Sequence, residues 1–129
     1  MILVDTSVWI EVFRRRRPLD LTAIVDFDDV ATCLPIVQEV LQGFRDEKAY
    51  RTARDAMLSL PIVESPLREE VFMDAVDLFR TARKTGRTVR SSTDCLIAAC
   101  ALRSDMEMLH RDRDFAVLAE ISTLRERTP

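Results

Sequence analysis

A short apolar run at the start of the chain, Ile2-Leu3-Val4, ends abruptly in the polar triplet Asp5-Thr6-Ser7. A run so rich in branched side chains is typical of a strand that is buried on both faces of a parallel sheet. The next apolar residues, Val8, Trp9, Val12 and Phe13, have helical spacing, which predicts a direct strand-to-helix turn. Ligands of open α/β sheets bind beyond the carboxyl ends of the strands, which is where Asp5 would lie.

The rest of the chain repeats this alternation of short strands and helices. Further strands are expected at residues 30–34, 61–63 and 106–109, with a last edge strand at 121–124. Helical patterns cover residues 19–27, 35–57 with a break near Gly43, 67–84, 95–102 and 115–120. Pro35 suits a first helical turn and Gly86 a helix C-terminal cap. The alternation predicts one α/β domain over residues 1–129, with three layers (α/β/α) and a short parallel central sheet flanked by helices.

Composition narrows the classes of function. Only two glycines occur, which excludes the glycine-rich loops that hold phosphates in nucleotide-binding folds. No apolar run approaches the roughly 20 residues that span a bilayer, and the N-terminus lacks the pattern of a signal peptide. The three cysteines, Cys33, Cys95 and Cys100, lie in apolar segments and are expected to be reduced and buried. We therefore expect a cytoplasmic protein that does not bind a membrane.

Carboxylates recur beside apolar structure at Asp5, Glu39, Asp94, Asp112 and Asp114. Clustered carboxylates repel one another, so gathering them requires protonation, a basic partner or a cation. Oxygen ligands of this kind suit Mg²⁺ or Mn²⁺, ions that can activate water for an in-line displacement at phosphorus. Five carboxylates in one such site would account for more than the whole net charge of −3, so the acidic balance does not exclude a polyanionic substrate.

Each acid also has a purely structural interpretation. Asp5 is compatible with a helix N-cap, and Glu39, at the edge of its helix's apolar arc, with a solvated helix residue. Ser91-x-x-Asp94 matches a capping box, although Asp94 adjoins a helix that is apolar on every side. Asp112 and Asp114 suit the start of a helix, where the helix dipole favours acids. The residues alone leave these alternatives open.

Four segments, in order, resemble the motifs of PIN-domain ribonucleases of the VapC toxin type. The segments are residues 1–10 (MILVDTSVWI), 35–44 (PIVQEVLQGF), 88–99 (TVRSSTDCLIAA) and 109–115 (LHRDRDF). The resemblance spans essentially the whole chain and implies a PIN-like fold. Carried over residue by residue, it makes Asp5, Glu39, Asp94 and Asp112 the catalytic, metal-coordinating acids. Asp114 matches a further metal-site acid found in many members, and Thr6 and Ser7 match a supporting hydroxyl position.

The family implies a Mg²⁺- or Mn²⁺-dependent endoribonuclease in which metal-activated water attacks an RNA phosphodiester. It further implies the toxin half of a toxin–antitoxin pair, with a VapB-type antitoxin as partner and a homodimer as the assembly. The alternative is a non-catalytic PIN-like module that binds RNA or protein. Such a module could lose an acid without consequence, whereas this chain has all four, which favours the enzyme.

The arginine run and the single histidine each have a functional and a structural interpretation. Arg14, Arg15, Arg16 and Arg17 are either possible RNA phosphate contacts or a solvated basic loop. His110 is the only histidine, so a metal-free mechanism with two histidines is not possible within one chain, and a structural role at its strand end is favoured.

Two other protein families also place acids at strand ends, and neither fits this sequence. A haloacid-dehalogenase-type phosphatase would need an Asp where Ser7 stands. A response-regulator receiver would need a late strand-end Lys, where this chain has Arg111.

Overall fold

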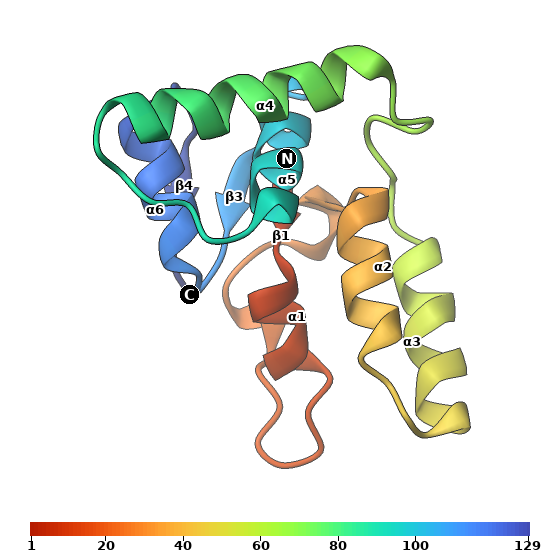
Figure 1. Ribbon diagram of the computed structural model, residues 1–129. Coiled ribbons are helices and arrows are strands. Elements are labelled where there is room, and N and C mark those ends of the chain that lie inside the picture. Colours follow the sequence, from red (N-terminus) through yellow and green to blue (C-terminus); the bar gives the residue numbers. More distant parts are fainter.

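A computed structural model describes residues 1–129 as a small parallel sheet with helices on both faces (Figure 1). The strands are β1 (Ile2–Val4), β2 (Val30–Ala31), β3 (Glu107–Leu109) and β4 (Glu126–Arg127). The helices are α1 (Thr6–Val12), α2 (Leu34–Gln42), α3 (Glu47–Leu58), α4 (Glu69–Lys84), α5 (Ser92–Arg103) and α6 (Arg113–Glu120). The predicted α/β/α architecture is confirmed. No helix has the length and apolar character needed to cross a membrane.

The sheet has the order β2-β1-β3-β4, and every pair of neighbouring strands is parallel. Val4 is paired with Leu109, so β1 and β3 end side by side. The backbone N–H of Asp5 continues this pairing by donating to the Leu109 carbonyl at 2.9 Å. Because all four strands run the same way, the residues that follow β1 and β3 meet at one edge of the sheet.

The core explains why the helices take these positions. Leu3, Val4, Met108 and Leu109 are all fully buried, as expected for strands covered on both faces. Helix α5, which is apolar on every side, packs against both α4 and α6 and also contacts α2 and β3. Burying α5 in the centre of the molecule brings its first turn, with Asp94, next to the ends of the strands.

Several predicted elements are confirmed, with their boundaries shifted. The break near Gly43 separates α2 from α3, Pro35 lies in the first turn of α2, and Gly86 follows α4 with a φ of +75°. The predicted strand at 30–34 is shorter, because α2 begins at Leu34. The predicted strand at 61–63 is reduced to one bridge between Thr32 and Ile62.

Two predictions were wrong. The helix expected over residues 19–27 is replaced by two 3₁₀ turns, Leu21–Ala23 and Phe27–Asp29. The side chains of Asp20 and Asp26 cap these turns by accepting from the backbone N–H two residues on, which competes with a continuous helix. The last strand lies at Glu126–Arg127 rather than at 121–124, where Leu124 is instead buried in the loop before β4.

The cysteines are placed as the sequence predicts. Cys33, Cys95 and Cys100 are all free and buried. Burial raises the pKa of the Cys95 thiol to about 11, so this thiol is protonated at neutral pH.

Candidate functional site

The candidate site begins where β1 turns into α1. Asp5 is the N-cap of α1, and its Oδ2 accepts hydrogen bonds from the backbone N–H of Ser7 at 3.0 Å and from Ser7 Oγ at 2.6 Å. The capping interpretation of Asp5 is therefore correct, but it uses only one of the two oxygens. Oδ1 is buried and has no hydrogen-bond partner. A buried carboxylate oxygen without a partner is costly, which distinguishes Asp5 from an ordinary cap.

Ser7 connects the ends of the two central strands. Its Oγ donates to Asp5 Oδ2 and also accepts from the backbone N–H of Arg111, just beyond β3, at 2.9 Å. Thr6 lies beside it, and its Oγ1 donates to Glu39 Oε1 of α2 at 3.1 Å. Two adjacent hydroxyls therefore orient an acid from β1 and an acid from α2.

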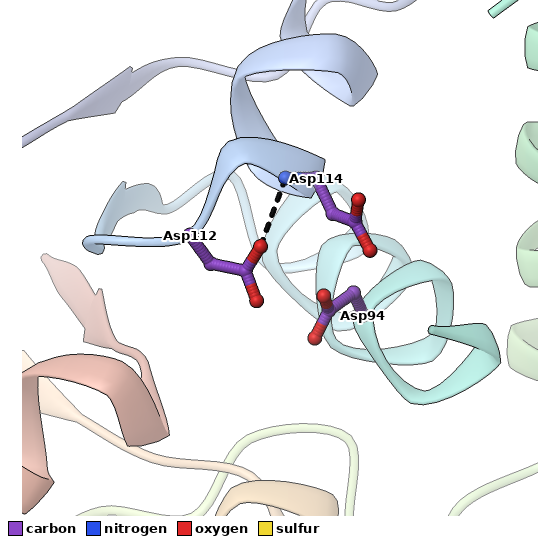
Figure 2. A group of neighbouring side chains, drawn as sticks. All are labelled: Asp94, Asp112 and Asp114. Carbon is purple, nitrogen blue, oxygen red and sulfur yellow. Dashed lines mark hydrogen bonds between the residues drawn. The ribbon is translucent and has the colours of Figure 1, made fainter. Parts of the chain in front are cut away.

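A second group of acids lies beyond β3 and at the start of α5. Ligand oxygens of Asp94, Asp112 and Asp114 all lie within 4.8 Å of one another, close enough to share one metal ion (Figure 2). Asp112 is the N-cap of α6, and its Oδ1 accepts from the backbone N–H of Asp114 at 2.9 Å. Asp94 is 4% exposed and its Oδ2 has no partner.

Asp114 has a structural task that the sequence did not reveal. Its Oδ2 accepts from two consecutive backbone N–H groups, those of Arg90 at 2.9 Å and Ser91 at 3.0 Å. Ser91 caps α5 by accepting from the N–H of Asp94 at 3.4 Å. The reciprocal half of a capping box is missing, because the Ser91 N–H is bound to Asp114 and not to Asp94. The capping-box interpretation of Asp94 is therefore wrong, and its carboxylate is not used as a cap.

The two groups of acids are close enough to perturb one another. The pKa of Asp94 is raised from 3.8 to about 9, first by burial and then by the negative charges of Asp112 and Asp5. Burial also raises the pKa of Asp5. Hydrogen bonds from Ser7 lower this pKa in part, and the charge of Asp112 raises it further. The pKa of Glu39 is raised by burial and by the charges of Asp5 and Asp112. All five predicted acids therefore belong to one electrostatic cluster, although only three form the tight group of ligand atoms.

Basic side chains do not neutralise this cluster. Arg111, which directly precedes Asp112, pairs through its Nε with Glu11 of α1. No salt bridge joins an arginine or lysine to Asp5, Glu39, Asp94 or Asp112. Of the three ways to gather carboxylates, pairing with a base is thus excluded, which leaves protonation or a bound cation.

The predicted arginine run lies away from the acids. Residues 14–17 are exposed and form the loop that projects from the far end of α1, at the bottom of Figure 1. Arg14 Nε donates to the Arg17 carbonyl at 2.8 Å, and Arg17 has a φ of +50°. The side chains of these four arginines are exposed to solvent, and the RNA contact remains a prediction.

Two residues contact the framework of the site: His110, for which the sequence predicted a structural role, and Glu126, which the sequence interpretation missed. His110 is buried and binds Glu126 of β4 on one side and the backbone N–H of Asp112 on the other. The structural role favoured for His110 agrees with these bonds. The sequence around Glu126 gives no indication of this contact, because Glu126 lies in a polar tail and its partner His110 is 16 residues earlier.

The α/β/α fold and the cluster of acids at the strand ends agree with the PIN-domain motifs that the sequence resembles. The PIN-domain family model matches residues 2–121, and the chain belongs to the PIN-domain family.

Among its relatives, ribonuclease VapC11 of Mycobacterium tuberculosis is 37% identical, over 97% of this chain and 96% of the relative. Two solved structures share the fold. VapBC2 from Rickettsia felis, bound to a DNA fragment of its promoter, has a TM-score of 0.75 at 16% identity, covering 100% of this chain and 99% of that chain. VapBC-5 from Mycobacterium tuberculosis, a member of the VapBC family of toxin–antitoxin systems, has a TM-score of 0.72 at 22% identity, with coverage of 98% and 97%.

Proposed function

We propose that the protein is a Mg²⁺- or Mn²⁺-dependent endoribonuclease whose metal site consists of Asp5, Glu39, Asp94 and Asp112, with Asp114 as a further acid. The observation that carries the proposal is that two buried carboxylate oxygens of the cluster, Asp5 Oδ1 and Asp94 Oδ2, have no hydrogen-bond partner. A third such oxygen, Glu11 Oε2, lies outside the cluster and is ion-paired with Arg111. Asp5 Oδ1 and Asp94 Oδ2 come from different elements and belong to one cluster with no basic partner. A hard divalent cation held by the cluster would supply the positive charge that these oxygens lack and would offset the repulsion among the acids.

The residues of this chain would perform distinct tasks. Asp5 and Asp94 offer their unpartnered oxygens to the ion, and Asp112 offers the oxygen that does not cap α6. Thr6 holds Glu39, and Ser7 holds Asp5 while tying it to the backbone beyond β3. When bound, the divalent ion supplies the positive charge that activates water and stabilises the phosphoryl oxygens during displacement. The fixed caps keep the acids from having to reorganise during the reaction.

RNA as the substrate is supported by the relatives and is compatible with the surface. The 37% identity to a ribonuclease covers nearly the whole chain. The exposed arginines at 14–17 supply positive charge that can position phosphates without reading sequence. We expect products with 5′-phosphate and 3′-hydroxyl ends, as the family resemblance implies.

We further propose a biological setting from the same relatives. The chain would be the toxin of a toxin–antitoxin pair, with a VapB-type antitoxin as its protein partner and a homodimer as its assembly. Residues 1–129 would act as one PIN domain, in the cytoplasm where the RNA is. The alternative, a non-catalytic PIN-like binding module, gives no reason for two unpartnered buried carboxylate oxygens.

Cleavage of RNA by the purified protein tests this proposal. Total cellular RNA is incubated with the protein plus Mg²⁺, Mn²⁺ or a chelator, and the new 5′ ends are sequenced. We expect cleavage only with a divalent ion. We expect Asp5→Asn to reduce the rate at least about 100-fold, because several kcal/mol of charge stabilisation would be lost.

Asp20→Asn is a matched control for Asp5→Asn. Asp20 Oδ1 accepts from the N–H and the Oγ1 of Thr22, at 3.1 and 2.6 Å, which repeats the cap made by Asp5. Asp20 is exposed and lies outside the acidic cluster. The control should cleave like the wild type. Equal rates for Asp5→Asn and Asp20→Asn, or no cleavage by the wild type with either ion, would refute the proposed nuclease.

A further inference from the structure

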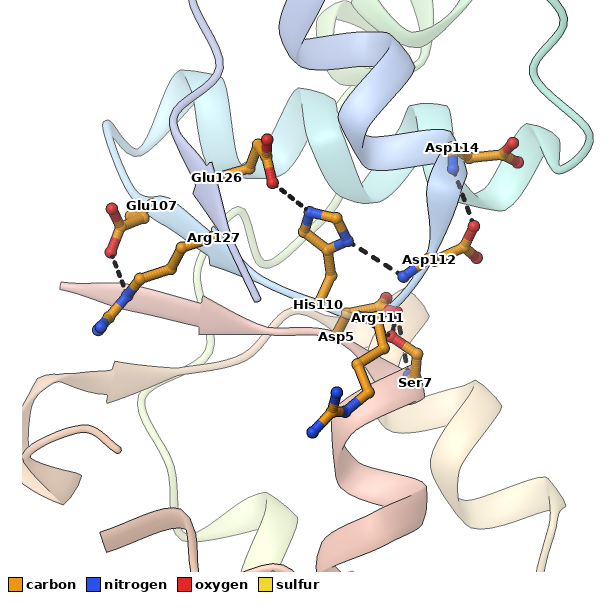
Figure 3. Close-up of polar contacts among 9 residues, drawn as sticks. All are labelled: Asp5, Ser7, Glu107, His110, Arg111, Asp112, Asp114, Glu126 and Arg127. Atoms are coloured by element: carbon orange, nitrogen blue, oxygen red, sulfur yellow. Dashed lines mark hydrogen bonds and ion pairs between the residues drawn. The ribbon is translucent and has the colours of Figure 1, made fainter. Parts of the chain in front are cut away.

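The only histidine of the chain lies directly behind the acidic cluster. His110 follows β3, is 2% exposed, and packs against the ring of Phe115 with a centroid distance of 5.3 Å. Both ring nitrogens are used: Nδ1 accepts from the backbone N–H of Asp112 at 3.1 Å, and Nε2 lies 2.6 Å from Glu126 Oε2 (Figure 3). The ring is therefore held on one side by β4 and holds the backbone before α6 on the other.

These contacts define the tautomer of the ring. Because Nδ1 accepts a backbone N–H, it carries no hydrogen of its own in this arrangement, and Nε2 donates its hydrogen to Glu126. A carboxylate that accepts from one ring nitrogen fixes both the ring's orientation and the basicity of the other nitrogen. Glu126 thereby prepares Nδ1 to accept from Asp112.

Asp112 is consequently fixed at two points. Its backbone N–H is bound by His110, and its Oδ1 is bound by the N–H of Asp114. Figure 3 shows this chain of contacts running from Glu126 through His110 and Asp112 to Asp114. With these two bonds in place, Asp112 keeps its remaining oxygen on the side of Asp94 (Figure 2).

We propose that His110 and Glu126 are positioning residues, which set Asp112 for metal binding and couple the last strand of the chain to the site. The proposal rests on the metal site proposed above. Glu126 lies beyond residue 121, where the match to the family model ends.

Strand β4 reinforces the same coupling through the backbone. The N–H of His110 donates to the carbonyl of Arg127 at 3.1 Å, next to the side-chain contact with Glu126. One two-residue strand thus holds His110 by its backbone and by its ring. Loss of the ring contact alone should leave the strand paired and the fold intact, which separates positioning from folding.

The test measures the affinity of the full chain for Mn²⁺ in the absence of RNA. The protein is titrated with Mn²⁺, and electron paramagnetic resonance reports the concentration of free Mn²⁺. Glu126→Leu removes the acceptor, whereas Glu126→Gln keeps an oxygen for Nε2–H. We expect Glu126→Leu to weaken Mn²⁺ binding about tenfold, which is at the low end of the losses seen when residues that support metal ligands are changed. Glu126→Gln should bind Mn²⁺ nearly as well as the wild type.

A second pair of variants tests the ring itself. His110→Asn places an amide oxygen near the position of Nδ1 and should retain much of the Mn²⁺ affinity, whereas His110→Leu should lose about tenfold. Circular dichroism checks that each variant is folded. If His110→Leu does not fold, the comparison at the partly exposed Glu126 still decides.

Glu107→Gln is the matched control. Glu107 also joins β3 to β4, through an ion pair with Arg127 at 2.9 Å, but it does not touch His110 (Figure 3). Binding equal to wild type for Glu107→Gln, with loss for Glu126→Leu, supports positioning. Equal Mn²⁺ affinity for wild type, Glu126→Leu and folded His110→Leu overturns it while leaving the nuclease proposal intact. No Mn²⁺ binding by the wild type would instead overturn the metal site itself.

Discussion

Asp94→Asn is expected to abolish metal-dependent RNA cleavage and, at the same time, to make the metal-free protein more stable. The substitution removes a proposed ligand, which should lower the rate at least about 100-fold. It also replaces a buried carboxyl that, in the metal-free fold, must either take up a proton or carry a charge that Asp112 and Asp5 repel. We expect the metal-free melting temperature to rise by about 3–5 °C, equivalent to about 1 kcal/mol. Differential scanning calorimetry in a chelator measures this.

The stability that Asp94→Asn gains in the metal-free protein should increase with pH. Asp94 has its pKa raised from 3.8 to about 9, so the folded metal-free protein favours the protonated carboxyl. The stability associated with that proton is fully present below about pH 4 and is lost as the pH rises towards 9. The difference in melting temperature between Asp94→Asn and wild type should therefore increase from pH 4 to pH 9. Adding Mn²⁺ should stabilise the wild type and not the variant.

A decrease in metal-free stability for Asp94→Asn at pH 8 would contradict this interpretation. It would mean that the carboxylate makes favourable contacts within the protein alone. Asp77→Asn, on the exposed face of α4, controls for the general effect of removing one negative charge. This control should neither stabilise the metal-free protein nor change cleavage.

Asp114→Ala is expected to have the largest effect on stability, a loss of about 3 kcal/mol. The two N–H groups bound by Oδ2, those of Arg90 and Ser91, would lose a charged acceptor, and such bonds contribute about 1.5–3 kcal/mol each. Asp114→Asn should cost much less, because a single amide oxygen can accept both bonds. Urea unfolding of the metal-free variants measures the difference.

Asp46 provides the comparison for an ordinary cap. Its Oδ2 accepts one bond, from the N–H of Ala49 at 2.8 Å, at the exposed start of α3. Asp46→Ala should cost about 1 kcal/mol, as helix N-caps usually do. A loss for Asp114→Ala no greater than that for Asp46→Ala would show that Asp114 does not hold the segment before α5. Equal losses for Asp114→Ala and Asp114→Asn would show that its charge matters more than its hydrogen bonds.

The fold was predictable where local and long-range preferences agree. The branched run Ile2–Val4, followed by a capping Asp, forms a buried strand and a helix N-terminus for reasons contained in the same few residues. Residues 19–27 have helical spacing as well, but the caps at Asp20 and Asp26 stabilise short turns instead.

The last strand could not be placed from apolar character. Residues 121–124 are more apolar than Glu126–Arg127, yet the polar pair forms the edge strand. Its side chains find specific partners, Glu126 with His110 and Arg127 with Glu107. Glu107 lies in β3 and His110 directly follows it, so these partners leave no periodic signal in the tail.

The site shows the same limit. The sequence identified the five acids, because each adjoins apolar structure and the motifs follow family order. It did not reveal which oxygens are already used. Ser91 and Asp94 have the spacing of a capping box, but Asp114, 23 residues after Ser91, takes the Ser91 N–H. Which oxygens stay without a partner depends on such long-range hydrogen bonds, and these oxygens are the basis of the metal proposal.

The most direct measurement is the position of Mn²⁺ in crystals of the protein, located by anomalous scattering. Our account predicts a strong peak within the acidic cluster formed by Asp5, Glu39, Asp94, Asp112 and Asp114. The peak should be absent in crystals of Asp94→Asn grown under the same conditions. No ion at this cluster, or an ion bound elsewhere, at Mn²⁺ concentrations that support cleavage would contradict the account.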